Sequence, residues 1–240
     1  MRRDAFSRIL RGVRQRLLWV FLFWGVGASL TWAFIIPVMS FLLAPSGGHL
    51  SPSGKPIFTN PTAMLNLQVE VSVKGGIILA APVVIFQLYR WLRPLFSRKV
   101  KQFIWWFLPL GLLSYLAGVT FAYLVLIPAG IQYLLGFGTE IATPMIDITE
   151  YMKLVTTLII WMGVVFETPV VMLVLSKTGI VDYRRFRKIR RYMIPAIFTF
   201  GVLITPGSDP VSALLVAVPL TVLYEAGIFL AWLARPRVRA

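Results

Sequence analysis

Long apolar runs separated by short polar segments restrict what this chain of 240 residues can fold into more than any other feature of its sequence. A helix needs about 20 mostly apolar residues to cross the hydrocarbon core of a bilayer. The runs therefore predict an all-α polytopic membrane protein, a single domain over residues 1–240 with six transmembrane helices. The predicted spans are residues 17–43, 69–92, 103–128, 151–175, 192–204 and 211–233. The fifth is too short for a normal bilayer, so we expect its end to lie at membrane depth beside other helices.

The balance of residue types excludes a soluble domain. Apolar residues make up 58% of the chain and charged residues 14%, whereas soluble domains have about 45–50% and about 25%. The chain has no cysteine and a single histidine, His49, so disulfides, thiolate metal sites and paired-histidine haem or zinc sites are excluded. We expect neither a metal nor a cofactor.

Basic residues are concentrated on one side of the predicted spans. The formal net charge is +15, and 21 of the 24 lysines and arginines lie in residues 1–16, 90–101, 177–191 and 235–240. Cytoplasmic loops of membrane proteins carry such an excess, so the pattern predicts a multi-pass protein of the cytoplasmic membrane with both termini in the cytoplasm. The positive charge then faces an anionic leaflet of the lipid bilayer, and no nucleic-acid partner is expected.

The sequence contains no recognisable constellation of catalytic residues. The only histidine lies in Ser46-Gly-Gly-His49, without a G-x-S-x-G or H-E-x-x-H sequence around it. A nucleophile needs a general base within hydrogen-bonding reach. A pair of aspartates inside the membrane is also missing, because all four aspartates fall in loops or at span ends. We therefore expect no enzymatic activity.

Glutamates inside the predicted spans are the most informative residues. An ionisable group in hydrocarbon costs about 3 kcal/mol or more, so it needs a partner, a water-filled cavity or a function. Glu167 lies near the middle of the fourth span, and Pro169 lacks a backbone donor, which favours a kink next to the carboxylate. Two interpretations stay open: a neutral acid bonded to a neighbouring carbonyl, or a polar site on a concave face that meets another chain. Glu225, in the sixth span, is the second such residue.

A set of motifs, in this order, resembles those of the TatC family, the multi-spanning core of the twin-arginine protein translocase. The motifs are Pro82-Val-Val-Ile-Phe-Gln-Leu-Tyr with Pro94 downstream, Phe121-Ala-Tyr-Leu-Val-Leu-Ile-Pro128, Phe166-Glu-Thr-Pro-Val-Val, Arg190-Arg-Tyr, Thr205-Pro-Gly-Ser-Asp-Pro-Val-Ser212, and Pro219-Leu with Tyr224-Glu225. Each motif is weak alone, but together with six spans the set is specific. The resemblance covers the chain from about Arg8 to Leu233.

The resemblance implies a curved, glove-shaped bundle with short fifth and sixth helices. It implies a subunit of the Sec-independent translocase that exports folded proteins across the cytoplasmic membrane and depends on the proton gradient. It also implies binding of twin-arginine signal peptides, single-span TatA- and TatB-type partners, and an oligomeric complex. By the same resemblance, the residues that contact signal peptides or partners are Arg14, Arg16, Glu167, Thr205, Asp209 and Glu225.

The chain departs from the family pattern where carboxylates are expected. The family's N-terminal motif reads roughly H-L-x-E-L-R-x-R-L, and Gly12 stands at the glutamate position, although Arg14 and Arg16 match. A second family glutamate falls on Val100, and Ala213 stands where the family often has a glutamine. Arginine–carboxylate pairs are strong because they are bidentate and charge-assisted. We therefore expect twin-arginine signals to bind poorly to this chain.

Three functions stay open on the sequence alone. The resemblance favours a translocase subunit that receives folded proteins for export. The missing glutamates favour a divergent paralogue that is a structural or assembly subunit of another membrane complex. A proton or small-solute transporter using Glu167 would be expected to show inverted repeats and paired broken helices, and the sequence shows neither.

Overall fold

The computed structural model describes residues 2–47, 56–58, 60, 62–92, 98–136, 146–205 and 210–234. Nearly all of these residues are helical, and none lies in a β-strand, which confirms the predicted all-α class. The helices are α1 (Arg2–Ala33), α2 (Ile35–Leu43), α3 (Ala63–Leu92), α4 (Arg98–Phe121), α5 (Ile127–Gly136), α6 (Ile148–Phe166), α7 (Thr168–Lys177), α8 (Tyr183–Ile204) and α9 (Pro210–Leu233). A 3-10 turn, Ala44–Ser46, follows α2, and a π-helical segment, Ala122–Leu126, joins α4 to α5.

Most of the predicted spans correspond to long apolar helices. The stretches of the described chain with the length and composition to cross a membrane are Gln15–Ala33, Ala63–Gln87, Phe107–Gly136, Ile148–Lys177 and Pro210–Leu233. The predicted fifth span, residues 192–204, is the apolar second half of α8, whose first half is basic. Helix α8 has 22 residues and α9 has 24, whereas Phe107–Gly136 and Ile148–Lys177 each have 30. Helices α8 and α9 are therefore shorter than these two stretches, and α3 begins earlier than predicted, at Ala63.

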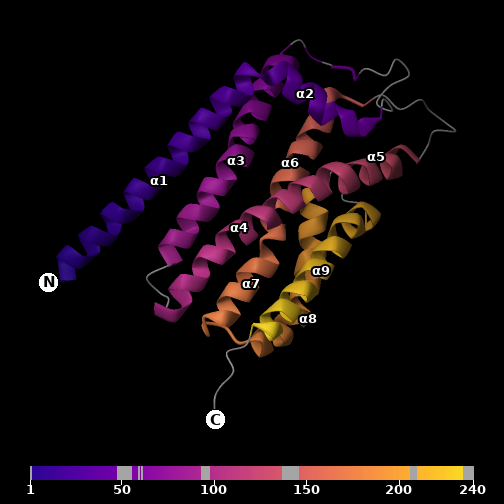
Figure 1. The fold of residues 1–240 in the computed structure, drawn as a ribbon. Coiled ribbons are helices and arrows are strands. Elements are labelled where there is room, and N and C mark those ends of the chain that lie inside the picture. The colour runs from indigo at the N-terminus through magenta and orange to yellow at the C-terminus, as the bar shows by residue number, and fades with distance from the viewer. Residues whose placement is uncertain are drawn as a thin grey trace.

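The first predicted span, residues 17–43, is not one straight helix. Helices α1 and α2 are separated at Phe34, whose backbone has φ −109° and ψ 31°. Pro37 accounts for the break, because it has no N–H to donate to the carbonyl of Ala33 one turn earlier. The part that can cross a membrane is Gln15–Ala33, and α2 turns away from the direction of α1 (Figure 1).

A proline also accounts for the π-helical segment between α4 and α5. Pro128 lacks the N–H that would bond to the carbonyl of Leu124, and the segment Ala122–Leu126 lies directly before it. Other prolines lie inside helices that stay continuous, namely Pro82, Pro109, Pro195 and Pro219. The described bundle therefore contains helices that are interrupted near a proline as well as helices that continue through one.

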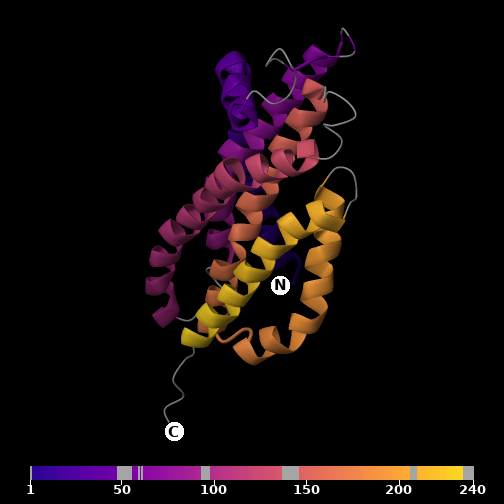
Figure 2. The same cartoon turned by 90° about the vertical axis from the view of Figure 1, so that its right-hand side faces the viewer.

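The helices are arranged around α6. Helix α1 lies along α3 on one side, α8 and α9 pack against each other on the other side, and α2 and α5 lie across one end (Figures 1 and 2). The core surrounds α6, whose Met152, Val155 and Met162 are almost fully buried. In the most apolar part of Gln15–Ala33, 11% of the residues are buried. In the most apolar part of Ile148–Lys177, 44% are buried. Helix α1 is therefore peripheral and α6 central.

The two ends of the bundle differ in chemistry. The N-terminal ends of α1, α4 and α8 and the C-terminal ends of α3, α7 and α9 lie at the same end (Figure 1). These are the helix ends that carry or adjoin the basic segments, which confirms that the cations are grouped on one side. At the opposite end, side-chain hydroxyls tie the helices together: Tyr151 donates to the carbonyl of Leu42 at 2.9 Å, and Tyr123 to that of Phe41 at 2.8 Å.

Candidate functional site

The predicted kink in the fourth span occurs at Glu167. Helix α6 ends at Phe166 and α7 begins after Glu167, with Pro169 in its first turn. Pro169 has no N–H for the carbonyl one turn earlier, so the helical hydrogen bonds are interrupted here. Ser114 of α4 donates its hydroxyl to the carbonyl of Phe166. The break is therefore held in place by a neighbouring helix, and it positions the Glu167 side chain at the boundary between two helices.

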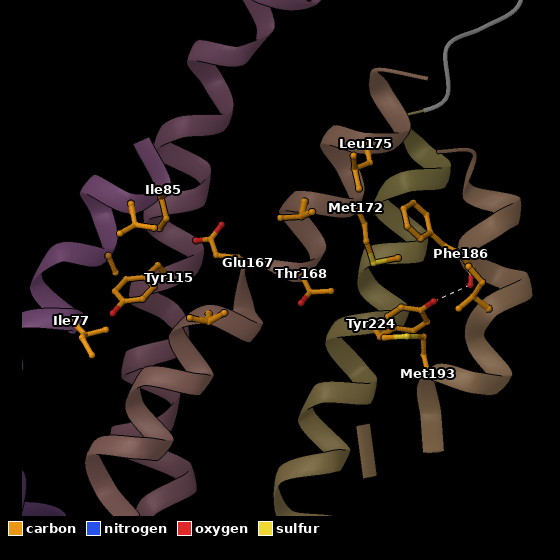
Figure 3. Close-up of a pocket in the computed structure, with 15 residues that line it drawn as sticks. Ile77, Ile85, Tyr115, Glu167, Thr168, Met172, Leu175, Phe186, Met193 and Tyr224 are labelled. Carbon is orange, nitrogen blue, oxygen red and sulfur yellow. Dashed lines mark hydrogen bonds between the residues drawn. The ribbon is translucent and has the colours of Figure 1, made fainter. Parts of the chain in front are cut away.

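A cavity of about 600 Å³ opens beside this break. Its walls come from α3, α4 and α6 on one side and from α8 and α9 on the other, with α7 between them (Figure 3). The lining residues are mainly apolar: Ile77, Ala81, Val84, Ile85, Tyr115, Val164, Glu167, Thr168, Val171, Met172, Leu175, Phe186, Ile189, Met193 and Tyr224. Glu167 is the only ionisable carboxylate among them, so the cavity is an apolar space with one acidic group on its wall.

Glu167 lies against α4. A β-carbon placed on Gly111 would be 3.3 Å from Oε2 of Glu167, so the glycine leaves the space that the carboxylate fills. Figure 3 shows Glu167 on the same side of the cavity as Tyr115 and Ile85. Its Oε1 is buried and has no hydrogen-bond partner among the described residues. Buried polar atoms are nearly always bonded, so this oxygen lacks a partner that such atoms usually have.

The opposite wall is fixed by hydrogen bonds between helices. The hydroxyl of Tyr224 on α9 donates to the carbonyl of Phe186 on α8 at 2.9 Å (Figure 3). Ser176 on α7 donates to the carbonyl of Ala231 on α9 at 2.7 Å, and this bond is buried. Two methionines line the cavity beside these bonds, Met172 on α7 and Met193 on α8. Because methionine is flexible and polarizable, such a wall adapts to apolar ligands of different shape.

The structure separates the residues that were predicted to contact signals or partners. Glu167 lies at the cavity, whereas Glu225 forms an ion pair with Arg190 of α8 at 2.7 Å. The buried Thr205 donates its hydroxyl to the carbonyl of Gly201 at 2.9 Å and lines a different, small hollow. Glu167 is therefore the only member of the predicted set that the described residues place in the cavity.

The N-terminal members of the predicted set belong to α1. Arg14, Arg16 and Gly12 are residues of this helix, and Arg16 is half-buried. The side chain of Arg14 lies outside the part that the structure describes, as do the side chain of Val100 on α4 and the whole of Asp209. The roles predicted for these residues stay predictions.

Sequence reasoning missed the aromatic and polar neighbours of Glu167. Tyr115 and Thr168 line the cavity, and the hydroxyl of Tyr115 is 3.3 Å from the carbonyl of Ile78. One signal was available for Tyr115, because Gly111 and Tyr115 are four residues apart and share one face of a helix. No such local signal pointed to Met193, because it reaches the cavity only through the packing of α8 on α9.

Comparison with known proteins gives the same family at the level of sequence and of fold. The family model described as Sec-independent protein translocase protein (TatC) matches residues 8–219. The Sec-independent protein translocase protein TatC of Aquifex aeolicus is 32% identical over 231 residues, which cover 94% of this chain and 93% of that protein. The TatC protein of Carboxydothermus hydrogenoformans is 31% identical over 212 residues, covering 88% of this chain and 86% of that protein.

A solved structure has the same arrangement of helices. It is described as the crystal structure of the twin-arginine translocase receptor TatC, and it superposes with a TM-score of 0.84 at 31% sequence identity. The match covers 94% of this chain and 98% of that one. The similarity therefore includes the helices that form the cavity as well as the peripheral α1.

Proposed function

This chain belongs to the TatC family of Sec-independent protein translocase proteins, and we propose that it is the multi-spanning receptor subunit of such a translocase in the cytoplasmic membrane. In that role it works within a complex, with TatA- and TatB-type single-span proteins as its partners and folded proteins as its cargo. The proton gradient supplies the driving force. Both termini and the basic end of the bundle face the cytoplasm, as the positive-inside rule implies.

The cavity beside Glu167 is the observation that carries this proposal. An export signal must place an apolar segment in the membrane, and a space of about 600 Å³ lined mainly by apolar side chains can receive part of one. The carboxylate of Glu167 on the cavity wall would accept a hydrogen bond from that segment. Apolar surface provides most of the binding free energy, and the single carboxylate fixes the position.

Recognition of the two arginines is expected to be weak in this receptor. Gly12 and Val100 supply no carboxylate, and two buried charges without partners would cost several kcal/mol. Asp182 does not replace them, because its carboxylate caps α8 and accepts from the backbone N–H of Arg184 at 3.4 Å. We therefore expect the signal to be held mainly through its apolar segment, or with a carboxylate supplied by a partner chain.

Site-specific photo-crosslinking tests where the signal binds. A photoreactive residue at Val171, which lines the cavity, should crosslink a twin-arginine signal peptide, and one at Leu113 should not. Leu113 is 64% exposed and does not line the cavity, so it is the matched control for an apolar residue of a spanning helix. Equal crosslinking at the two positions, or none at Val171, would contradict a signal-binding cavity.

The role of Glu167 is tested with a charge-neutral variant. Glu167→Gln should fold normally and lower the yield of the Val171 crosslink. The reason is that the neutral amide oxygen of glutamine is a weaker hydrogen-bond acceptor than a carboxylate. Glu150→Gln, which changes an exposed glutamate at the start of α6, is the control and should leave the yield unchanged. Equal crosslink yields for the two variants would show that Glu167 does not contribute to signal binding.

Copurification distinguishes the receptor from a scaffold of another complex. The chain should copurify with single-span TatA- or TatB-type proteins after mild detergent extraction. A stable complex with unrelated membrane proteins, together with no crosslink to any export signal, would favour the divergent structural subunit instead.

A further inference from the structure

The first half of α8 has two faces of opposite chemistry. Phe186, Ile189 and Met193 line the cavity, so this face points into the bundle. Because successive residues of an α-helix are turned by about 100°, the opposite face carries Arg184, Arg187, Lys188 and Arg191. We call these four residues the basic stripe. All four are exposed, and none of them lines the cavity.

The basic stripe is not neutralised by the described part of the chain. Two carboxylates of α8 and its neighbour α9 are already engaged: Asp182 caps α8, and Glu225 pairs with Arg190, which is not part of the stripe. No cation of the stripe forms a salt bridge with a described carboxylate. Arg191 instead donates to the hydroxyl of Tyr192 at 2.6 Å, and its guanidinium lies 4.7 Å from the centre of that ring. Four like charges within two helical turns therefore need counter-charges from outside the protein.

The same face of α8 becomes apolar immediately beyond the stripe. Ile194 and Phe198 continue it, and both are exposed, at 40% and 37%. Tyr192, which is 61% exposed, lies at the change from basic to apolar, where tyrosine is typical of a membrane–water interface. A ligand that fits this face must be anionic at one end and apolar along its length.

We propose that the outward face of α8 binds an anionic phospholipid, with its phosphate held by the basic stripe and its acyl chains along Ile194 and Phe198. Arginine suits this role because its planar guanidinium binds phosphate oxygens with two parallel hydrogen bonds. The charge of the face and the order of its basic and apolar parts match a lipid standing in the leaflet. A free phosphate would use the cations and leave the apolar part unoccupied.

This site is separate from the cavity and does not depend on the proposed function. A lipid bound there would hold the short α8 at the interface, where its apolar half is too short to span a bilayer alone. The membrane would then help to position the α8 wall of the cavity.

Spin-labelled lipids test the proposal on the full chain in phosphatidylcholine vesicles. The motionally restricted fraction of spin-labelled phosphatidylglycerol should exceed that of spin-labelled phosphatidylcholine. The combined variant Arg184→Gln, Arg187→Gln, Lys188→Gln and Arg191→Gln should lower the relative association constant of phosphatidylglycerol at least about fivefold, the factor expected for one cation at an anionic surface. Replacing Arg184, Arg187 and Arg191 by lysine should preserve more of the selectivity than the glutamine variant does, because the charges remain although the paired hydrogen bonds of the guanidinium are lost. Added inorganic phosphate should not displace the labelled lipid.

A matched control separates a defined site from general attraction between charges. Replacing Arg2, Arg3, Arg8 and Arg11 by glutamine removes the same formal charge from another basic segment, and this variant should keep most of the selectivity. Equal loss in both variants would overturn the proposal. A photoreactive phosphatidylglycerol provides a second measurement that needs no variant: its crosslinks should map to α8. Crosslinks confined to other helices would show that a lipid does not occupy this face.

Discussion

Nε of Arg190 lies 2.7 Å from Oε1 of Glu225, so an ion pair joins α8 to α9. Glu225 was predicted as an acid in the middle of the sixth span that contacts a partner, and the structure gives it a partner within the chain. The pair is partly exposed, with side-chain exposures of 51% and 38%. Together with the bond from Tyr224 to Phe186, it fixes the angle at which α8 closes one side of the cavity.

The contribution of this ion pair to stability should be small. A double-mutant cycle with Arg190→Gln and Glu225→Gln should give a coupling free energy of at most about 1 kcal/mol, because partly exposed pairs are screened by solvent. The measurement is the free energy of unfolding of the four proteins in the same detergent. A coupling well above that value would mean that the pair is shielded by lipid or by a partner.

The packing of α1 on α3 should depend on glycine at position 76. A β-carbon on Gly76 would lie 2.7 Å from the carbonyl oxygen of Trp24 and 2.8 Å from the backbone nitrogen of Ala28. Gly76→Ala should therefore push the helices apart and destabilise the fold by about 1–3 kcal/mol. Gly25→Ala is the control, since its β-carbon would meet nothing within 4 Å. Thermal unfolding of the two variants checks the difference, and equal stabilities would contradict the close approach of α1 to α3 at this glycine.

The buried hydrogen bond from Ser176 to Ala231 should stabilise the contact of α7 with α9. Ser176→Ala should lower the free energy of unfolding by about 0.6 kcal/mol and by no more than about 1.7 kcal/mol, the mean and the maximum found for hydrogen bonds between membrane helices. Ser29→Ala is the same substitution at an exposed serine that bonds to Gly25 of its own helix. Its effect should be close to zero, and a comparable loss at both sites would show that the bond between helices adds nothing.

Restoring the missing acids should strengthen binding of twin-arginine signals. The double variant Gly12→Glu with Val100→Glu should improve the binding free energy of a twin-arginine peptide by about 2–5 kcal/mol at most, because it supplies partners for the two arginines. Peptide titration in detergent measures the change. The contrary result is tight binding of the peptide to the unaltered chain, lost when the peptide's arginines are replaced by lysines. That result would show that the arginines are recognised without acidic residues at positions 12 and 100.

The orientation of the bundle can be determined directly, because the native chain contains no cysteine. A cysteine replacing Lys55 should react with an impermeant thiol reagent added to intact cells, and one replacing Arg185 should not. Both should react once the membrane is permeabilised. Labelling of the Arg185 position from outside would reverse the predicted topology.

The class of the protein and its membrane spans followed from the sequence because hydropathy is a property of each segment by itself. A run of apolar residues needs lipid or protein around it wherever it lies in the fold, and a proline interrupts helical bonds in any context. This is why the kink at Glu167 and the grouping of the cations could be predicted. Phe34 shows the limit, since the proline that breaks the first predicted span was visible but the direction of the following helix was not.

The composition of the site was decided only by tertiary structure. Glu167 is distant in sequence from Gly111, against which it lies, and from Met193, which lines the same cavity. These residues come together only because α4, α7 and α8 pack at particular angles. Likewise, nothing local to Glu225 indicates Arg190 as its partner. The sequence alone therefore determined which segments enter the membrane and on which side the charges gather. The shapes of side chains packed between distant helices determined which acid lines the cavity and which is neutralised.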